Sequence, residues 1–367
     1  MGTPTAAHPP RMQSICSARK RGANSTTAID AACSNPARPN AQPSHRHARA
    51  RPTLIEYSCT EYTFLFYSKH IPPYRKKRFP ATRKVVCLKG ILMRYRSMAL
   101  ASLLLLGGCT AVVKQSSFFP ASVKPPEGAL VPPPGYKVED MVMALPGLGR
   151  VHAVRLSNPQ SSATVLYAGG NMSFVAGQSA TVAALAEATR ANIILYDYPG
   201  RGGTDVPATV DALISFGPAF IAQLRAQNWL GSEPLFVYGL SFGGSQAAGI
   251  ARQAKAAGLI LEGSAADIAA IGRNAVPTLM KPFVHVRTDA DLARFDYEGY
   301  AIESAAPILL ISSQDDQVVR PQIMTDFAAR LRERGASVTT VSVPGPHGRA
   351  LREAAAIAAV RRFTAGK

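Results

Sequence analysis

The sequence predicts an α/β fold in which a mostly parallel sheet is covered by helices on both faces. From residue 136 onward, short apolar runs alternate with stretches of helical periodicity, which is the pattern of strands buried on both faces. These strands are expected at residues 164–168, 193–196, 235–238, 259–261, 308–311 and 338–343. In such a sheet, functional side chains gather at the carboxyl ends of the strands, where the crossover loops meet.

The segments around these strands complete a predicted domain over residues 136–367. An antiparallel hairpin is expected from residues 136–145 and 150–156. Helices are expected after Ser241 and at residues 181–190, 208–227, 322–334 and 349–363. Proline inside a helix removes a hydrogen bond and clashes with the preceding turn, so Pro218 is expected to break or kink its helix.

One long interruption separates two of the predicted strands. Residues 262–305 are too long for an ordinary loop, and we expect them to form a short lid of small helices over the site. Met280, Phe283 or Phe295 are the side chains expected to line an acyl pocket there.

The positive charge of the chain lies mainly at its beginning. The net charge is +18, but residues 1–92 hold 16 Lys or Arg and three acids, whereas the remainder holds 25 basic and 20 acidic residues. The folded part is therefore near neutral, and no nucleic-acid partner is expected. The five cysteines include no C-x-x-C pair, so neither a metal site nor a disulfide framework is predicted, and no cofactor is called for.

A secretory signal follows this basic segment. Residues 93–98 form a basic stretch that begins with methionine, residues 99–106 are apolar, and Leu-Gly-Gly-Cys closes the pattern at Cys109. This ending resembles the lipobox of bacterial lipoproteins. The resemblance implies a signal peptide over 93–108, lipidation of Cys109 and a membrane anchor on the periplasmic face of the cell envelope.

The segments on either side of this signal are interpreted from it. Because a signal works at the start of a chain, we hypothesise that translation begins at Met93; residues 1–92 are then a mis-annotated extension, the alternative being a basic disordered tail. Residues 109–135 are rich in proline and are expected to be an extended tether to the folded domain.

The stretch from Gly239 to Gly243 is the strongest functional motif. It reads G-x-S-x-G between a buried strand and a helix of small residues, the order required of a nucleophile elbow. Ser241 is therefore the predicted nucleophile; the alternative is a tight turn in which this serine only caps the helix.

A nucleophilic serine needs a base and a carboxylate that orients the base. After a G-x-S-x-G elbow the expected chain order is Ser, then Asp or Glu, then His. His347 follows the last predicted strand and is the predicted base. Asp316 follows the strand at 308–311 and is favoured as the acid, because two valines after it would hold its loop; Asp315 is the alternative. The other readings are that either aspartate only caps a turn and that His347 is a surface histidine without a role.

The oxyanion hole requires two backbone N–H groups. Phe242, directly after the nucleophile, supplies one. Asn171 is assigned the other, because Gly169 and Gly170 allow its loop to approach closely. A simple Gly-Gly turn is the alternative reading of this loop.

Three of these stretches resemble the α/β-hydrolase superfamily. Residues 169–172 are similar to the His-Gly-Asn-Ala oxyanion stretch of its serine aminopeptidase-like and Bem46-like members, with Gly169 in place of the histidine. Residues 197–204 resemble their D-Y-x-G-x-G-x-S loop, and Leu-Glu-Gly at 261–263 also matches. The resemblance implies the α/β-hydrolase fold and hydrolysis of a carboxylic ester or related acyl bond, on a small acyl-ester substrate, through an acyl-enzyme.

Two other functions use the same residues. A hydrolase-fold lipoprotein without turnover would bind a ligand or partner at the envelope. A peptidase or amidase would use the same serine, histidine and aspartate, but needs a site for a peptide terminus, for which the sequence offers no convincing candidate.

Overall fold

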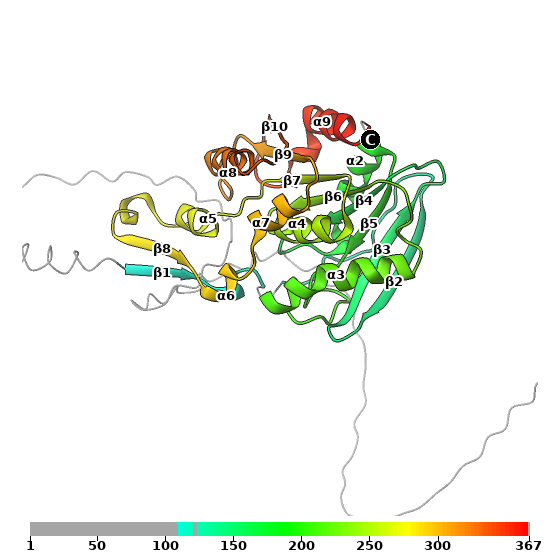
Figure 1. Ribbon diagram of the computed structural model, residues 1–367, viewed down its shortest axis with the longest axis horizontal. Helices are drawn as coiled ribbons and strands as arrows, with labels where there is room; N and C mark the ends of the chain where they lie inside the picture. The colour runs from blue at the N-terminus through cyan, green and yellow to red at the C-terminus, as the bar shows by residue number, and fades with distance from the viewer. Residues whose placement is uncertain (1–108, 120–122, 366–367) are drawn as a thin grey trace, which may run out of the picture. The chain divides into compact units, whose positions relative to one another are not determined.

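A computed structural model describes residues 109–119 and 123–365, and the predicted extension and signal peptide lie outside these ranges. Its centre is an eight-stranded sheet in the order β10-β9-β7-β6-β4-β5-β3-β2 (Figure 1). The strands are β2 (Lys137–Leu145), β3 (Gly149–Ser157), β4 (Thr164–Ala168), β5 (Asn192–Tyr196), β6 (Leu235–Leu240), β7 (Gly258–Glu262), β9 (Ile308–Ser313) and β10 (Val338–Val343).

The sheet is mostly parallel, as predicted. Strands β5, β4, β6, β7, β9 and β10 run parallel to their neighbours in this series. The hairpin of β2 and β3 is antiparallel and joins the sheet through β5. The carboxyl ends of the parallel strands therefore meet at one edge, which gathers the loops that carry the candidate site.

Helices cover both faces of this sheet (Figure 1). Helices α3 (Val210–Ala226), α4 (Gly243–Ala254) and α8 (Pro321–Glu333) contribute to one apolar core, and α2 (Ser179–Thr189) and α9 (Ala354–Ala365) contribute to the other. The odd and even positions of each central strand divide between the two cores, because successive side chains point to opposite faces. This arrangement is the α/β-hydrolase fold expected from the sequence.

Helix α3 is continuous through Pro218, contrary to the expectation of a break. Phe216 and Phe220 flank the proline and are both buried; their rings lie 5.2 and 5.0 Å from the Tyr196 ring on the sheet. Packing of this helix face onto the sheet stabilises the helical conformation on either side of the missing hydrogen bond.

The lid contains a strand that the sequence analysis missed. Its elements are α5 (Ile268–Asn274), β8 (Val284–Thr288), α6 (Ala290–Ala293), α7 (Tyr297–Glu303) and the short 3-10 helix η3 (Thr278–Met280). Strand β8 pairs in parallel with β1 (Cys109–Val113), which makes a separate two-stranded sheet. Among the described residues, no helix is long and apolar enough to cross a bilayer.

The segment expected to be an extended tether is packed on the domain at its beginning, whereas residues 124–135 are mostly exposed and form no helix or strand. Ala111 and Val113 of β1 are buried in a small apolar cluster with residues of the lid. After the 3-10 helix η1 (Gln115–Ser117), Phe118 stacks on Phe242 with ring centroids 4.7 Å apart. Further along, Val131 N donates to Ser179 Oγ at 3.0 Å. The proline content predicted an extended chain, but the apolar side chains before the prolines bury themselves against the lid.

Candidate active site

Ser241 lies on a strained corner between β6 and α4. Its φ is 54°, in the left-handed region that residues other than glycine rarely adopt. A Cβ on Gly239 would lie 2.5 Å from Gly244 Cα, and a Cβ on Gly243 would overlap the carbonyl oxygens at the end of β4. Both glycines of the motif are therefore required sterically, because strand β6, helix α4 and strand β4 meet here without room for side chains.

His347 and Asp316 are hydrogen-bonded to each other. His347 Nδ1 lies 2.6 Å from Asp316 Oδ2 and donates to it. Asp316 is 1% exposed, and its other oxygen accepts from the backbone N–H groups of Val318 and Val319, both at 2.8 Å. The carboxylate is thus held rigidly, with one oxygen reserved for the imidazole.

The neighbouring Asp315 points elsewhere. Its Oδ2 accepts from Gly345 N at 3.2 Å, across the turn that precedes the histidine. Of the two adjacent carboxylates, the structure therefore brings Asp316 to His347 and uses Asp315 to hold the loop. Val318 and Val319 hold the Asp316 carboxylate in place through their backbone N–H groups.

Ser241 and His347 line the same cavity. Within the described ranges the two side chains form no hydrogen bond with each other. Room for the imidazole beside the elbow comes from Gly263, where a Cβ would lie 3.1 Å from His347 Nδ1 and where φ is +51°. Distances between a nucleophile and its base are often long in the absence of substrate.

The predicted oxyanion loop lies beside Ser241. A Cβ on Gly170 would sit 3.8 Å from Ser241 Cβ. The N–H groups of Asn171 and Phe242 have no hydrogen-bond acceptor among the described residues, and both residues line the cavity. Two unpaired donors beside the serine are what a developing oxyanion requires.

Two residues whose roles the sequence analysis did not assign support this loop. Tyr198, fully buried, donates from its hydroxyl to the Gly169 carbonyl oxygen, and Arg201 Nη2 donates to the Asn171 carbonyl oxygen at 3.2 Å. These two hydrogen bonds fix the carbonyl oxygens of Gly169 and Asn171, while the Asn171 N–H has no acceptor among the described residues. The only sequence signal was the resemblance of residues 197–204 to a family loop, which named no role for them.

Glu262 is a third residue whose role was not predicted. It is 3% exposed; its Oε2 accepts from the Tyr238 hydroxyl at 2.6 Å and its Oε1 from Ala350 N at 2.9 Å. Its backbone oxygen accepts from Ser241 N at 2.9 Å. Burial raises the pKa of the Glu262 carboxyl. The residue joins the elbow to the loop that carries His347.

The other two histidines of the domain have different surroundings. His152 Nδ1 lies 2.6 Å from Asp197 Oδ2, and its Nε2 lies 2.9 Å from Asp140 Oδ1. The hydrogen bond to Asp197 is the main cause of a raised His152 pKa, against which burial acts. His285 is exposed on β8. Neither is among the residues that line the cavity with the nucleophile.

The cavity has a volume of about 900 Å³ and mainly apolar walls. Phe295 lines it, as expected, and so do Phe118 and Pro126 from the segment expected to be a tether. Met280 and Phe283 do not fit the expectation of an acyl pocket: they are 45% and 40% exposed. Among the described residues, no group of three or more His, Cys, Asp or Glu could hold a metal ion.

The chain belongs to the alpha/beta hydrolase family, whose model matches residues 168–364. The esterase Pf2001 of Pyrococcus furiosus has a similar structure, with 17% identity and a TM-score of 0.51 over 66% of this chain and 99% of that chain. Carboxyl esterase 2 of the fungus Tuber melanosporum also matches, with 17% identity and a TM-score of 0.48 over 67% and 93%. A thermostable esterase of Pseudomonas putida has 21% identity and a TM-score of 0.47 over 66% and 84%. Among curated proteins, none matches this chain.

Proposed function

We propose that this protein is a serine hydrolase that cleaves a carboxylic ester or related acyl bond through an acyl-enzyme. One arrangement carries the proposal: a serine on a strained corner shares a cavity with a histidine that is bound to a buried aspartate. The nucleophile is Ser241, the base His347 and the orienting acid Asp316.

The reaction has two halves. Ser241 Oγ attacks the acyl carbonyl while His347 Nε2 takes its proton, and Asp316 stabilises the imidazolium that forms. The N–H groups of Asn171 and Phe242 bind the oxyanion. His347 then protonates the departing alcohol oxygen, leaving the acyl group on the serine. Water, deprotonated by the same histidine, attacks the acyl-enzyme. The imidazolium then returns this proton to Ser241 Oγ as the acyl–oxygen bond breaks, which releases the acid and the free serine.

The shape of the cavity supports a small acyl ester as the substrate. Its walls are mainly apolar and its volume of about 900 Å³ is in the range of small-molecule sites. Carboxyl groups near the cavity are already engaged: Asp296 Oδ1 accepts from Gly299 N, and Glu298 forms ion pairs with Arg330 and Arg334. The mainly apolar walls therefore suit an apolar acyl chain.

Labelling with a fluorophosphonate and turnover of p-nitrophenyl acyl esters test this function. We expect the wild-type protein to be labelled at Ser241, and Ser241→Ala to lose both labelling and about 10⁶ in kcat. An alanine variant that retains turnover would exclude this mechanism. A panel of acyl chain lengths would then define the acyl pocket.

We further propose that the protein is close to the serine aminopeptidase-like and Bem46-like members of its family and is held at the cell envelope. The first point is supported by the loops at 169–172 and 197–204. The second is supported by the signal pattern that ends at Cys109, and it makes this cysteine the lipidated residue. Mass spectrometry of native protein should find a diacylglyceryl-modified Cys109 at its N-terminus; peptides from residues 1–92 would contradict it.

A further inference from the structure

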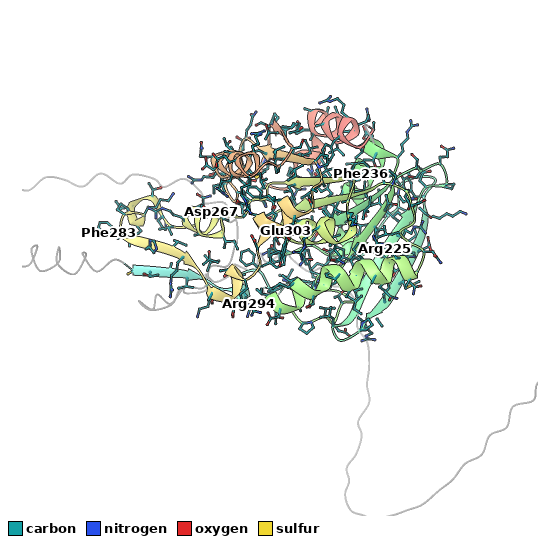
Figure 2. All side chains as sticks on the ribbon, in the orientation of Figure 1. Arg225, Phe236, Asp267, Phe283, Arg294 and Glu303 are labelled. Carbon is teal, nitrogen blue, oxygen red and sulfur yellow. The ribbon has the colours of Figure 1, made fainter. Side chains whose placement is uncertain are left out.

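The outer end of the lid exposes an apolar turn. In the described part of the chain, seven large apolar side chains are exposed, and three of them lie within residues 279–283, which we name the lid tip: Leu279 at 84%, Met280 at 45% and Phe283 at 40%. Figure 2 shows Phe283 at the end of the lid that points away from the central sheet. Exposed apolar side chains that cluster in this way mark an interaction surface.

The lid tip is an ordered turn. Met280 N donates to the Pro277 carbonyl at 2.8 Å, and Phe283 N donates to the Met280 carbonyl at 3.0 Å. These bonds satisfy backbone groups that would otherwise be costly to transfer from water to an apolar phase. The tip therefore presents apolar side chains on a backbone whose polar groups are largely paired.

The charged residues nearest the lid tip are basic. Lys281 lies within the tip, and Arg273 Nη2 donates to the Lys281 carbonyl oxygen at 3.4 Å. The acids closest in sequence, Asp267 and Asp289, lie at the opposite ends of α5 and β8 from the tip. An apolar tip surrounded by basic residues complements the surface of a bilayer that contains anionic lipids.

The candidate lipidation site lies at the same place. Cys109 N donates to the Phe283 carbonyl at 2.9 Å, and β1 runs from there alongside β8 into the domain. Two segments far apart in sequence, one predicted to carry a lipid and one exposing apolar side chains, thus meet at one end of the lid.

We propose that the lid tip inserts into the surface of an anionic phospholipid bilayer. The proposal adds to the proposed lipid anchor: the anchor fixes the protein to the membrane, and the tip sets the orientation of the lid on it. Ile268 and Ile271 of α5, in the same part of the lid, line the cavity. The helix that leads to the tip therefore also contributes to the active-site cavity.

Tryptophan fluorescence tests this docking directly. The full chain has a single tryptophan, Trp229, which is 1% exposed, so a second tryptophan at the tip reports its own environment. The test protein is Leu279→Trp in a Cys109→Ser background, which removes the anchor. The matched control is Val142→Trp on β2, where the valine is 50% exposed. Vesicles contain phosphatidylcholine and phosphatidylglycerol, with brominated phosphatidylcholine as the quencher.

We expect the vesicles to shift the Leu279→Trp emission to shorter wavelength and to quench it about twofold, with little effect on the control. In the Cys109→Ser protein, changing Leu279 and Phe283 together to serine should lower vesicle affinity by about tenfold or more, whereas Val142→Ser should not. Circular dichroism and turnover of a soluble p-nitrophenyl ester establish that each variant is folded. A loss of docking with unchanged turnover separates this proposal from the proposed enzyme function.

Three results would overturn the proposal. Equal quenching at positions 279 and 142, or none at either, would show that the tip does not insert and that any binding is through other basic segments. If the emission maximum of Leu279→Trp already lies at short wavelength without vesicles, the chain's own residues cover the tip. If the emission maximum moves to short wavelength without vesicles only at high protein concentration, a second copy of the chain covers the tip.

Discussion

Asp316→Asn tests how the candidate triad is oriented. Asp316 Oδ1 accepts two backbone N–H groups at 2.8 Å, so an asparagine keeps its carbonyl oxygen there and turns its NH₂ toward His347. An NH₂ group cannot accept from Nδ1–H. The imidazole must then carry its proton on Nε2, where it can no longer take the proton of Ser241.

The expected loss follows from this tautomer. The same change in a serine protease triad lowers kcat about 10⁴-fold, which corresponds to about 5 kcal/mol of transition-state stabilisation. Asp315→Asn is the matched control, because its carboxylate contacts Gly345 N rather than the histidine; we expect less than about a tenfold effect there.

The assay is kcat and KM for p-nitrophenyl butyrate, with thermal unfolding measured on each variant. Because asparagine and aspartate have nearly the same shape, Asp316→Asn should remain folded, and the loss should lie in kcat. The reasoning is refuted if Asp316→Asn stays within about tenfold of the wild type, or if Asp315→Asn is the more damaging change.

Three further predictions concern the supports of the site. Gly243→Ala should lower the free energy of unfolding by about 1–3 kcal/mol or more, because the added Cβ has no space. The control is Gly249→Ala in the same helix, where the added Cβ would lie 3.7 Å from the nearest atom; urea unfolding should show this change to be neutral or stabilising. Tyr198→Phe leaves the buried Gly169 carbonyl oxygen without its donor, so it should lower the free energy of unfolding by about 1–3 kcal/mol. It should also lower kcat by a larger factor than it raises KM. A kcat equal to that of the wild type would contradict the role of Tyr198 in supporting the oxyanion loop. His152→Gln should remove stability only at low pH, because the raised pKa of His152 gives stability that is complete below its ordinary value of about 6.5 and is lost as pH rises through the folded-state pKa. Urea unfolding at pH 5.5 and 8.5 measures the difference, and an equal cost at both values would contradict it.

The fold could be predicted from the sequence because its signals are local. The six runs predicted as strands from residue 164 to residue 343 all form parallel strands. Five of them are almost wholly buried, and a strand buried on both faces needs apolar residues wherever it lies in the sheet. The sixth, β10, lies at the edge and is only partly buried. The corner at Ser241 was equally local: two glycines around a serine, between a strand and a helix, describe a steric requirement that the folded chain also shows.

Long-range contacts could not be predicted in this way. Nothing in residues 109–113 indicates that they pair with residues 284–288, and a strand of five residues is stable only with its partner. The sequence alone had suggested a place for Phe283 in an acyl pocket, whereas the structure leaves it 40% exposed at the outer end of the lid (Figure 2). Pro218 is the converse case, in which tertiary packing of the helix outweighed a local signal.

By itself, the sequence determined the class of fold, the positions of the six parallel strands along the chain and the three loops from which Ser241, Asp316 and His347 come. Only the tertiary structure decided which of two adjacent carboxylates faces the imidazole, that Glu262 and Tyr198 support the site, and that Cys109 lies against the lid tip. The physical reason is range: periodicity and backbone sterics act within a few residues, whereas hydrogen bonds and packing between distant segments depend on how the whole chain closes.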